Sequence, residues 1–206
     1  MIKKLAAVST ALALIVSPTA AFADAAKPGQ SMTHIKTVAG IASTLEAAGV
    51  ILYVQGGATS AVMGDSIASP DGQVVFHVPI TGTKTGVEHT GSNIVFFNTN
   101  NNKQVQLRNP LIDLKKGEIS AVIPQATGQS TPVLKITNAD QLKAGITNDR
   151  KAQLKTTAYK GAALSLAPGI GAALTTLLGL PDGAIPEGLA FATADVTLYS
   201  TLKVKK

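Results

Sequence analysis

The C-terminal segment LAFATADVTLYSTLKVKK (189–206) constrains the fold most, because its apolar and polar residues alternate with a period of two. Successive side chains of a β-strand point to opposite faces of a sheet, so this alternation predicts a strand with one face in the core and one in solvent. Strands usually have about 3–10 residues and this run is longer, so we expect it to bend or to change sheets. The apolar positions are Ala192, Ala194, Val196, Leu198, Leu202 and Val204, and the polar ones are Thr193, Asp195, Thr197, Tyr199 and Thr201.

Turn residues divide the middle of the chain into further short runs that are apolar or alternating. Pro70-Asp71-Gly72 is a turn signal, and the asparagine-rich segment 98–102 predicts a hairpin between the two runs that flank it. The segment 138–160 is polar and irregular, and no element is predicted there. The predicted strands are VILYV (50–54), QVVFHVPI (73–80), NIVFF (93–97), KQVQLRN (103–109), PLIDL (110–114), EISAVI (118–123) and TPVLKIT (131–137).

Two short helices are predicted from apolar residues at helical spacing. In KTVAGIASTLEAAGV (36–50), apolar residues recur every three or four positions up to Gly49, a residue typical of helix ends. In PGIGAALTTLLGLPDG (168–183), Pro168 is typical of a helix start and Gly179 of a helix end. Each segment leads towards a β-rich stretch, which indicates that the helices cap a β-core.

These patterns predict a mainly β protein, an antiparallel β-sandwich-like domain with two short α-helices near 38–48 and 169–178. The runner-up is an irregular α+β domain. The chain has no cysteine, and a domain of this length buries enough surface to be stable without disulfides. The same absence excludes thiolate catalysis and cysteine-based metal sites.

The N-terminal sequence MIKKLAAVSTALALIVSPTAAFADAAKPGQ has the pattern of a secretory signal peptide, with two lysines, an apolar run and the cleavage pattern Ala21-Phe22-Ala23. The apolar run is too short to cross a bilayer as a helix, so no transmembrane segment is expected. We expect an exported protein that is secreted, periplasmic or at the cell surface. The expected divisions are a signal peptide (1–23), a flexible lead-in (24–35) and a single β-rich domain (36–206).

The distribution of charged and aromatic residues argues against nucleic-acid binding. The formal net charge is +6, aromatic residues make up 4% of the chain, and there is no tryptophan. Binding to nucleic acid needs a basic face, often with stacking aromatics. The basic residues here are spread along the chain, apart from a short lysine-rich C-terminus, so we expect no nucleic-acid partner.

Catalytic motifs are absent from the sequence. Histidine occurs only at positions 34, 77 and 89, and there is no nucleophile elbow, zinc-protease motif, phosphate loop or dinucleotide fingerprint. His77 and His89 could gather with Glu88 or Asp113 around a metal, but their separation is not a recognised ligand spacing. We therefore predict that the protein is not an enzyme and has no metal site.

Two residues remain as candidates for ligand binding. Tyr53 falls on the opposite face of its predicted strand from Leu52 and Val54, so it either packs as a wall residue or contacts a ligand. His89 lies in the glycine-bracketed turn of GVEHTGSNIVFF (86–97), where it either binds a ligand or forms hydrogen bonds within its own loop. His34 falls in the expected lead-in and is given no role.

The segment 86–123 runs from the His-x-Gly turn through a strand, a hairpin and LRNPLID to a second glycine turn and EISAVI. This order resembles the central part of the haem-transport-associated (HtaA) domain and related exported actinobacterial domains; the rest of the chain shares only the order of elements. The resemblance implies that a tyrosine on an N-terminal helix ligates haem iron and that a histidine supports it. His89 matches the histidine, whereas the helix near 38–48 has no tyrosine and the nearest one is Tyr53.

The resemblance therefore makes Tyr53 and His89 the candidate haem-binding residues, with haem against the end of the sheet formed by 86–97. Our prediction is an exported, non-enzymatic binding or surface-interaction domain of HtaA-like fold that needs no cofactor and has an unknown small ligand or envelope component as partner. The alternatives are a haem-transport protein and a structural or adhesive component of the cell envelope. A carrier should have a ligand-sized apolar pocket beside Tyr53 or His89, and an adhesive module an exposed apolar patch or an unpaired strand edge.

Overall fold

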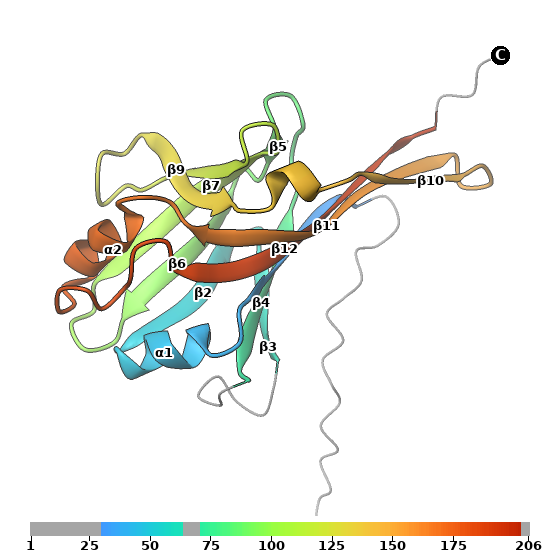
Figure 1. Cartoon of the computed structure of the whole chain (residues 1–206). Coiled ribbons are helices and arrows are strands. Elements are labelled where there is room, and N and C mark those ends of the chain that lie inside the picture. Colours follow the sequence, from blue (N-terminus) through green and yellow to red (C-terminus); the bar gives the residue numbers. More distant parts are fainter. Residues whose placement is uncertain (1–29, 64–70, 203–206) are drawn as a thin grey trace, which may run out of the picture.

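The computed structural model describes residues 30–63 and 71–202 (Figure 1). The predicted signal peptide and the last four residues lie outside these ranges. Within them no helix has the length and apolar character needed to cross a membrane. The elements in chain order are β1 (Met32–Thr37), α1 (Ile41–Ala47), β2 (Val50–Gly56), β3 (Thr59–Met63), β4 (Gln73–Pro79), β5 (Val87–Glu88), β6 (Ser92–Asn98), β7 (Gln104–Asp113), β8 (Glu118–Val122), β9 (Ser130–Ile136), the 3₁₀ turn η1 (Ala139–Gln141), β10 (Gly145–Asp149), β11 (Leu154–Leu166), α2 (Ile170–Leu178) and β12 (Ala190–Thr201).

The twelve strands of the described residues belong to one sheet, in the order β2-β6-β7-β8-β9-β11-β12-β1-β4-β3, with β5 added beside β7 and β10 beside β11. Neighbouring strands are antiparallel throughout. The two ends of this order, β2 and β3, follow one another in the chain and are joined through Gly57 and Ala58. The sheet therefore curls until its two edges nearly meet, and its concave face encloses one apolar core.

The connection between the two edges depends on a glycine. Gly56 has a φ of 75°, and a Cβ added there would overlap the carbonyl oxygen of Gly91. The next residue, Gly57, donates its backbone N–H to that same oxygen at 3.1 Å. Only a residue without a side chain fits this close approach of two backbones.

Apolar side chains from strands and helices fill the core. Phe96 and Phe191, from strands far apart in the sequence, place their ring centres 5.9 Å apart. Helix α1 buries Ile41 and Leu45, and α2 buries Leu174 among other residues. Both helices lie at the same end of the curled sheet, where they cover the core (Figure 1).

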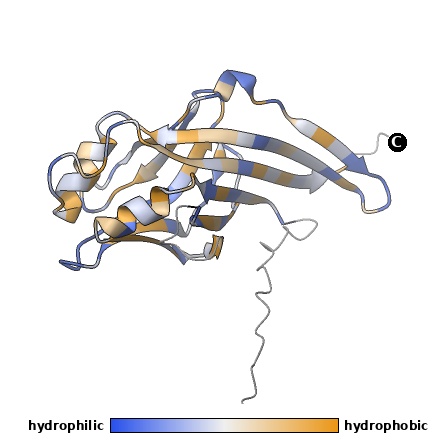
Figure 2. Cartoon of the chain, turned by 60° about the horizontal axis from the view of Figure 1, so that its bottom comes forward, coloured by the Kyte–Doolittle hydropathy of each residue, from blue (hydrophilic) through white to orange (hydrophobic). Residues whose placement is uncertain are grey.

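The other end of the molecule carries a three-stranded projection (Figure 1). This projection, which we call the arm, consists of β10, residues 154–160 of β11 and residues 196–202. Residues 196–201 belong to β12, and residue 202 follows it. A register shift between Tyr159 and Ala162 marks where β11 leaves the body. All five residues of β10 are exposed. Figure 2 shows hydrophilic and hydrophobic residues mixed along the arm.

The mainly β fold with two short helices is confirmed. Helices α1 and α2 fall within the predicted segments, and β6 and β7 form the predicted hairpin around residues 98–102. The strands belong to one curled sheet whose parts face each other, and the long C-terminal strand stays within it. The segment 138–160, which carried no prediction, contains η1, β10 and the start of β11.

The prediction of a flexible lead-in over 24–35 is wrong for its last part. Residues 32–37 form β1, which pairs with β12 on one side and with β4 on the other. Thr33 and Ile35 point into the core and are buried, while His34 lies on the outer face of the sheet. The β-rich domain therefore begins before residue 36.

Candidate functional site

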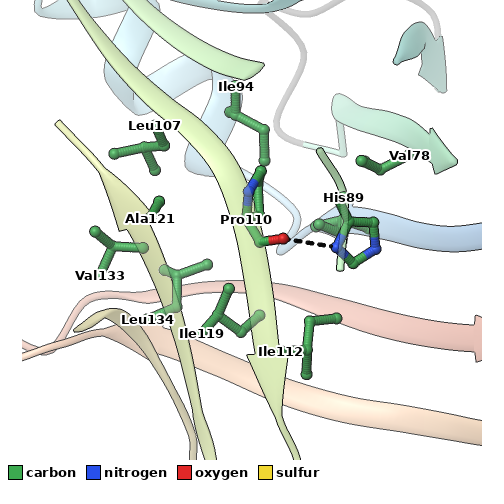
Figure 3. A pocket seen from close by; sticks show the side chains of 11 residues that line it. Val78, His89, Ile94, Leu107, Pro110, Ile112, Ile119, Ala121, Val133 and Leu134 are labelled. Atoms are coloured by element: carbon green, nitrogen blue, oxygen red, sulfur yellow. Dashed lines mark hydrogen bonds between the residues drawn. The ribbon is translucent and has the colours of Figure 1, made fainter. Parts of the chain in front are cut away.

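His89 lies inside the molecule, in the short connection between β5 and β6. Its side chain is only 2% exposed, and both ring nitrogens have partners. Nδ1 lies 3.0 Å from the carbonyl oxygen of Pro110, and Nε2 lies 2.8 Å from Oγ1 of Thr33. Figure 3 shows the ring and its contact with Pro110 among apolar side chains. His89 therefore joins β7 to β1 across the interior and does more than bond within its own loop.

The partners of His89 fix its tautomer. A carbonyl oxygen can only accept, so Nδ1 carries the proton and donates it to Pro110, and Nε2 accepts the hydroxyl proton of Thr33. Burial lowers the pKa of His89, and the backbone hydrogen bonds of Pro110 and Val87 oppose this shift more weakly. The ring is thus held neutral, with its one free lone pair already used by Thr33.

The space beside His89 is too small for a ligand. The cavity there has a volume of about 10 Å³, which is the room of about one water molecule. It is lined by apolar core residues that include Ile35, Ile94 and Ile112 (Figure 3). Pockets for drug-sized ligands have volumes of about 300–1,000 Å³, so haem has no room at this position in the present conformation.

Tyr53 lies on the opposite face of the sheet from His89. Its strand neighbours Val50 and Leu52 point into the core, whereas Tyr53 is half-buried on the outer face, where its hydroxyl donates to Oε1 of Gln104 at 3.1 Å. Tyr53 is therefore a packed wall residue with a satisfied hydroxyl. The structure does not bring Tyr53 and His89 together, so one ligand cannot contact both in this arrangement.

Polar side chains surround Tyr53 on this outer face. Nε of Arg108 donates to Oε1 of Gln106 at 2.6 Å, and Gln106 is itself only 6% exposed. The backbone N–H of Gln106 is bonded to Oε1 of Gln125 at 3.2 Å. Hydrogen bonds between side chains therefore link the polar residues of this face.

Two larger open spaces lie along the arm. A groove of about 380 Å³ runs between the root of the arm and the loops at 83–87 and 112–115, and Tyr159 and Leu198 form its arm side. A second hollow of about 460 Å³ lies further out on the arm and is lined by Ile146 and Lys155 among others. Ile146, Thr157 and Leu198 are paired across the three strands, so they share one face. We call this face, with its two hollows, the arm groove.

The arm also presents an unpaired strand edge. Within the described residues β10 pairs only with β11, so its other edge leaves backbone N–H and C=O groups free. Ile146, at 56% exposure, is the most exposed large apolar side chain of the described residues. Natural proteins commonly protect such edges with lysine, proline or bulges, and β10 (GITND) has neither lysine nor proline.

The charge of the arm groove is mainly positive. Lys84 and Lys115 line the inner hollow and Lys155 the outer one, while Asp113 is the one acidic residue among the lining residues. Nζ of Lys116, which is not among the lining residues, lies 3.9 Å from a carboxylate oxygen of both Asp113 and Glu118. The groove therefore combines apolar contact surface with unneutralised lysines.

Sequence reasoning missed a second pair of residues. His34 and His77 are opposite one another on β1 and β4, on the outer face of the sheet, with ring centres 4.6 Å apart. The signal that could have found them is the period of two in each strand, but the residues of β1 fall in the segment that the sequence predicts to be a lead-in. His77 and His89 do not come together, because the two rings lie on opposite faces of the sheet.

No family model, no curated protein and no solved structure matches this chain. The resemblance of residues 86–123 to the HtaA domain therefore stays an expectation from sequence.

Proposed function

We propose that this chain is an exported, non-enzymatic interaction module that binds an extended polypeptide segment along its arm. The observation that carries the proposal is the free edge of β10, which is exposed over its whole length and lies beside an open groove. An extended segment that adds to such an edge gains main-chain hydrogen bonds, and neighbouring hollows select its side chains.

The chemistry of the arm groove indicates what the segment should contain. An apolar side chain of the added segment would pack against Ile146, and an acidic side chain would lie near Lys155. Because strand side chains alternate in direction, a segment of alternating apolar and polar residues with some carboxylates fits best. The pattern of residues 1–23 supports an exported location for this interaction.

The interior gives less support to the haem-transport alternative. His89 is enclosed, its two ring nitrogens are used by Pro110 and Thr33, and the cavity beside it is about 10 Å³. Haem could reach His89 only after the core opened. The free edge and the exposed Ile146 are the features expected of an adhesive or surface-interaction module.

The proposal is tested with Ile146→Lys, which places a charge on the free edge and should block strand addition. The matched control is Val62→Lys on β3, another edge strand, where Val62 is 47% exposed. Fluorescently labelled protein is titrated onto envelope preparations of the cells that secrete it. We expect Ile146→Lys to weaken binding at least about tenfold, a loss of about 1.4 kcal/mol, and Val62→Lys to leave it unchanged. Equal binding by all three proteins, or a loss only in Val62→Lys, would refute the arm as the binding surface.

A further inference from the structure

The chain around β10 carries opposite charges at equal distances from one apolar residue. Lys143 lies three residues before Ile146, and Asp149 lies three residues after it. All three side chains are exposed. Two copies of such a segment that run antiparallel bring the lysine of each copy opposite the aspartate of the other. The segment 143–149 is therefore complementary to itself.

Neither of these charges is neutralised by the described part of the chain. Lys143 and Asp149 form no ion pair within residues 30–63 and 71–202. Oδ1 of Asp149 accepts the backbone N–H groups of Lys151 and Ala152 at 2.9 and 3.0 Å. The turn after β10 thus holds the carboxylate at the end of the free edge, where a cation from another molecule can reach it.

Two-fold symmetry restricts how β10 can pair with a second copy. In an antiparallel pair of identical strands, one residue lies opposite itself at the axis, and residues equally distant from the axis lie opposite one another. With Ile146 at the axis, the two isoleucines meet, and Lys143 of each copy lies opposite Asp149 of the other. This register covers an apolar side chain that is 56% exposed, and it places two pairs of opposite charges across the strands, which is a stabilising arrangement.

The other registers centred on the inner residues of β10 fit less well. With Thr147 at the axis, Lys143 would lie opposite Lys151, and like charges in opposite positions are destabilising. With Asn148 at the axis, the exposed isoleucine would lie opposite Arg150. Of these three registers, the one at the isoleucine alone combines an apolar pair with opposite charges.

We propose that the extended segment that adds to β10 is β10 of a second copy of this chain, paired antiparallel about Ile146. This inference rests on the proposed function, because it names the partner of the same free edge. The two arms then form one continuous antiparallel sheet, and each edge provides partners for the free N–H and C=O groups of the other (Figure 1). An edge of five residues is short and small interfaces are typically transient, so the dimer is reversible.

The first test is sedimentation equilibrium of the purified protein over a range of concentrations, in which the wild type should show a monomer–dimer equilibrium. Lys143→Asp alone and Asp149→Lys alone should each weaken dimerisation at least about tenfold, because each places like charges opposite one another twice. An equimolar mixture of the two variants should dimerise as the wild type does, since each new charge then faces its opposite. Lys151→Asp is the matched control, because Lys151 falls opposite Gln141 in this register, and it should leave the equilibrium unchanged.

Disulfide trapping tests the register without relying on these charges. The chain has no cysteine, so each variant carries a single thiol. Ile146→Cys places two thiols at the axis, where opposed Cα atoms lie about 4.5–5.5 Å apart, within the range that a disulfide spans. Asn148→Cys, on the same face of β10, is the matched control, because its two thiols are offset by about 14 Å along the strands. Under mild oxidation we expect a covalent dimer from Ile146→Cys and none from Asn148→Cys.

The inference is overturned if the wild type stays monomeric, if Asn148→Cys cross-links as readily as Ile146→Cys, or if the mixed charge variants fail to dimerise although circular dichroism shows both to be folded. A monomer whose binding to the envelope preparation still depends on Ile146 would overturn this inference alone and would show that another polypeptide adds to β10. A monomer whose envelope binding is unchanged by Ile146→Lys would overturn the proposed function as well.

Discussion

His89→Ala should destabilise the protein strongly, because the residue lies in the core although its sequence context is a turn. The substitution leaves Oγ1 of Thr33, which is fully buried, without its partner, whereas the carbonyl oxygen of Pro110 loses the ring but keeps the backbone N–H of residue 89. Each unsatisfied buried group costs about 1–3 kcal/mol. Removal of a buried aromatic ring costs about 3–5 kcal/mol through lost contacts and the cavity left behind.

These contributions overlap, so we expect the free energy of unfolding to fall by about 3–5 kcal/mol in total. This is a large part of the free energy of unfolding of a folded domain, which is about 5–15 kcal/mol. The measurement is urea unfolding followed by circular dichroism and by tyrosine fluorescence. Thr90→Ala changes the exposed neighbour of His89 and should alter the free energy of unfolding by no more than about 0.5 kcal/mol.

A double-mutant cycle with Thr33→Val isolates the contact between His89 and Thr33. Valine keeps the shape of threonine but leaves Nε2 of His89 without its donor, so the single change should cost about 1–3 kcal/mol. The coupling energy should be about 0.5–3 kcal/mol, as for residues in direct contact. A loss below about 1 kcal/mol for His89→Ala, or no coupling to Thr33, would refute the placement of His89 in the core.

Three further predictions concern pH and two anchoring contacts. Because burial lowers the pKa of His89, the unfolded chain binds more protons below its ordinary pKa of about 6.5. The contribution of His89 to the free energy of unfolding should therefore be complete above that pH and should decrease as the pH falls towards the lowered pKa of the folded state. The decrease should be smaller in His89→Gln, and a wild-type free energy that does not change with pH would contradict this. In urea unfolding, Gly56→Ala should lower the free energy of unfolding more than Gly128→Ala does, since both glycines have positive φ but only Gly56 faces a backbone oxygen. Equal losses would show that a Cβ at residue 56 does not overlap that oxygen. Glu187 accepts the N–H groups of Gly169 and Ala172 at 2.8 and 2.7 Å, so Glu187→Ala should lower the thermal midpoint by an amount equal to about 1 kcal/mol, and Glu187→Gln by less.

The parts of the fold that follow from sequence are those in which the core is built from apolar side chains alone. The alternation of Ala192, Ala194 and Val196 predicts β12 because each of these residues is buried in the core. The same rule misses β1, where two of the buried positions are Thr33 and Thr37. Thr37 is buried because its Oγ1 accepts the N–H of Val74 at 2.9 Å, a contact between strands that the local sequence does not show.

The candidate site could be predicted only in part for a similar reason. The glycines around His89 are typical of a turn, and the ring's burial depends on partners 21 and 56 residues away along the chain. The packing of Tyr53 is one of the two roles that its place in an alternating strand allows. The arm left no signal in residues 138–160, because β10 has no buried face and so no apolar alternation.

The proposed binding surface is tested most directly by site-specific cross-linking from the arm edge. The chain has no cysteine, so Thr147→Cys on β10 carries a single photo-cross-linker, and Thr59→Cys on the exposed edge of β3 is the matched control. Both labelled proteins are added to an envelope preparation of the source cells and illuminated. The account predicts a discrete adduct with a polypeptide from position 147, reduced by Ile146→Lys, and none from position 59. The absence of an adduct from position 147, or an equal yield from both positions, would contradict it.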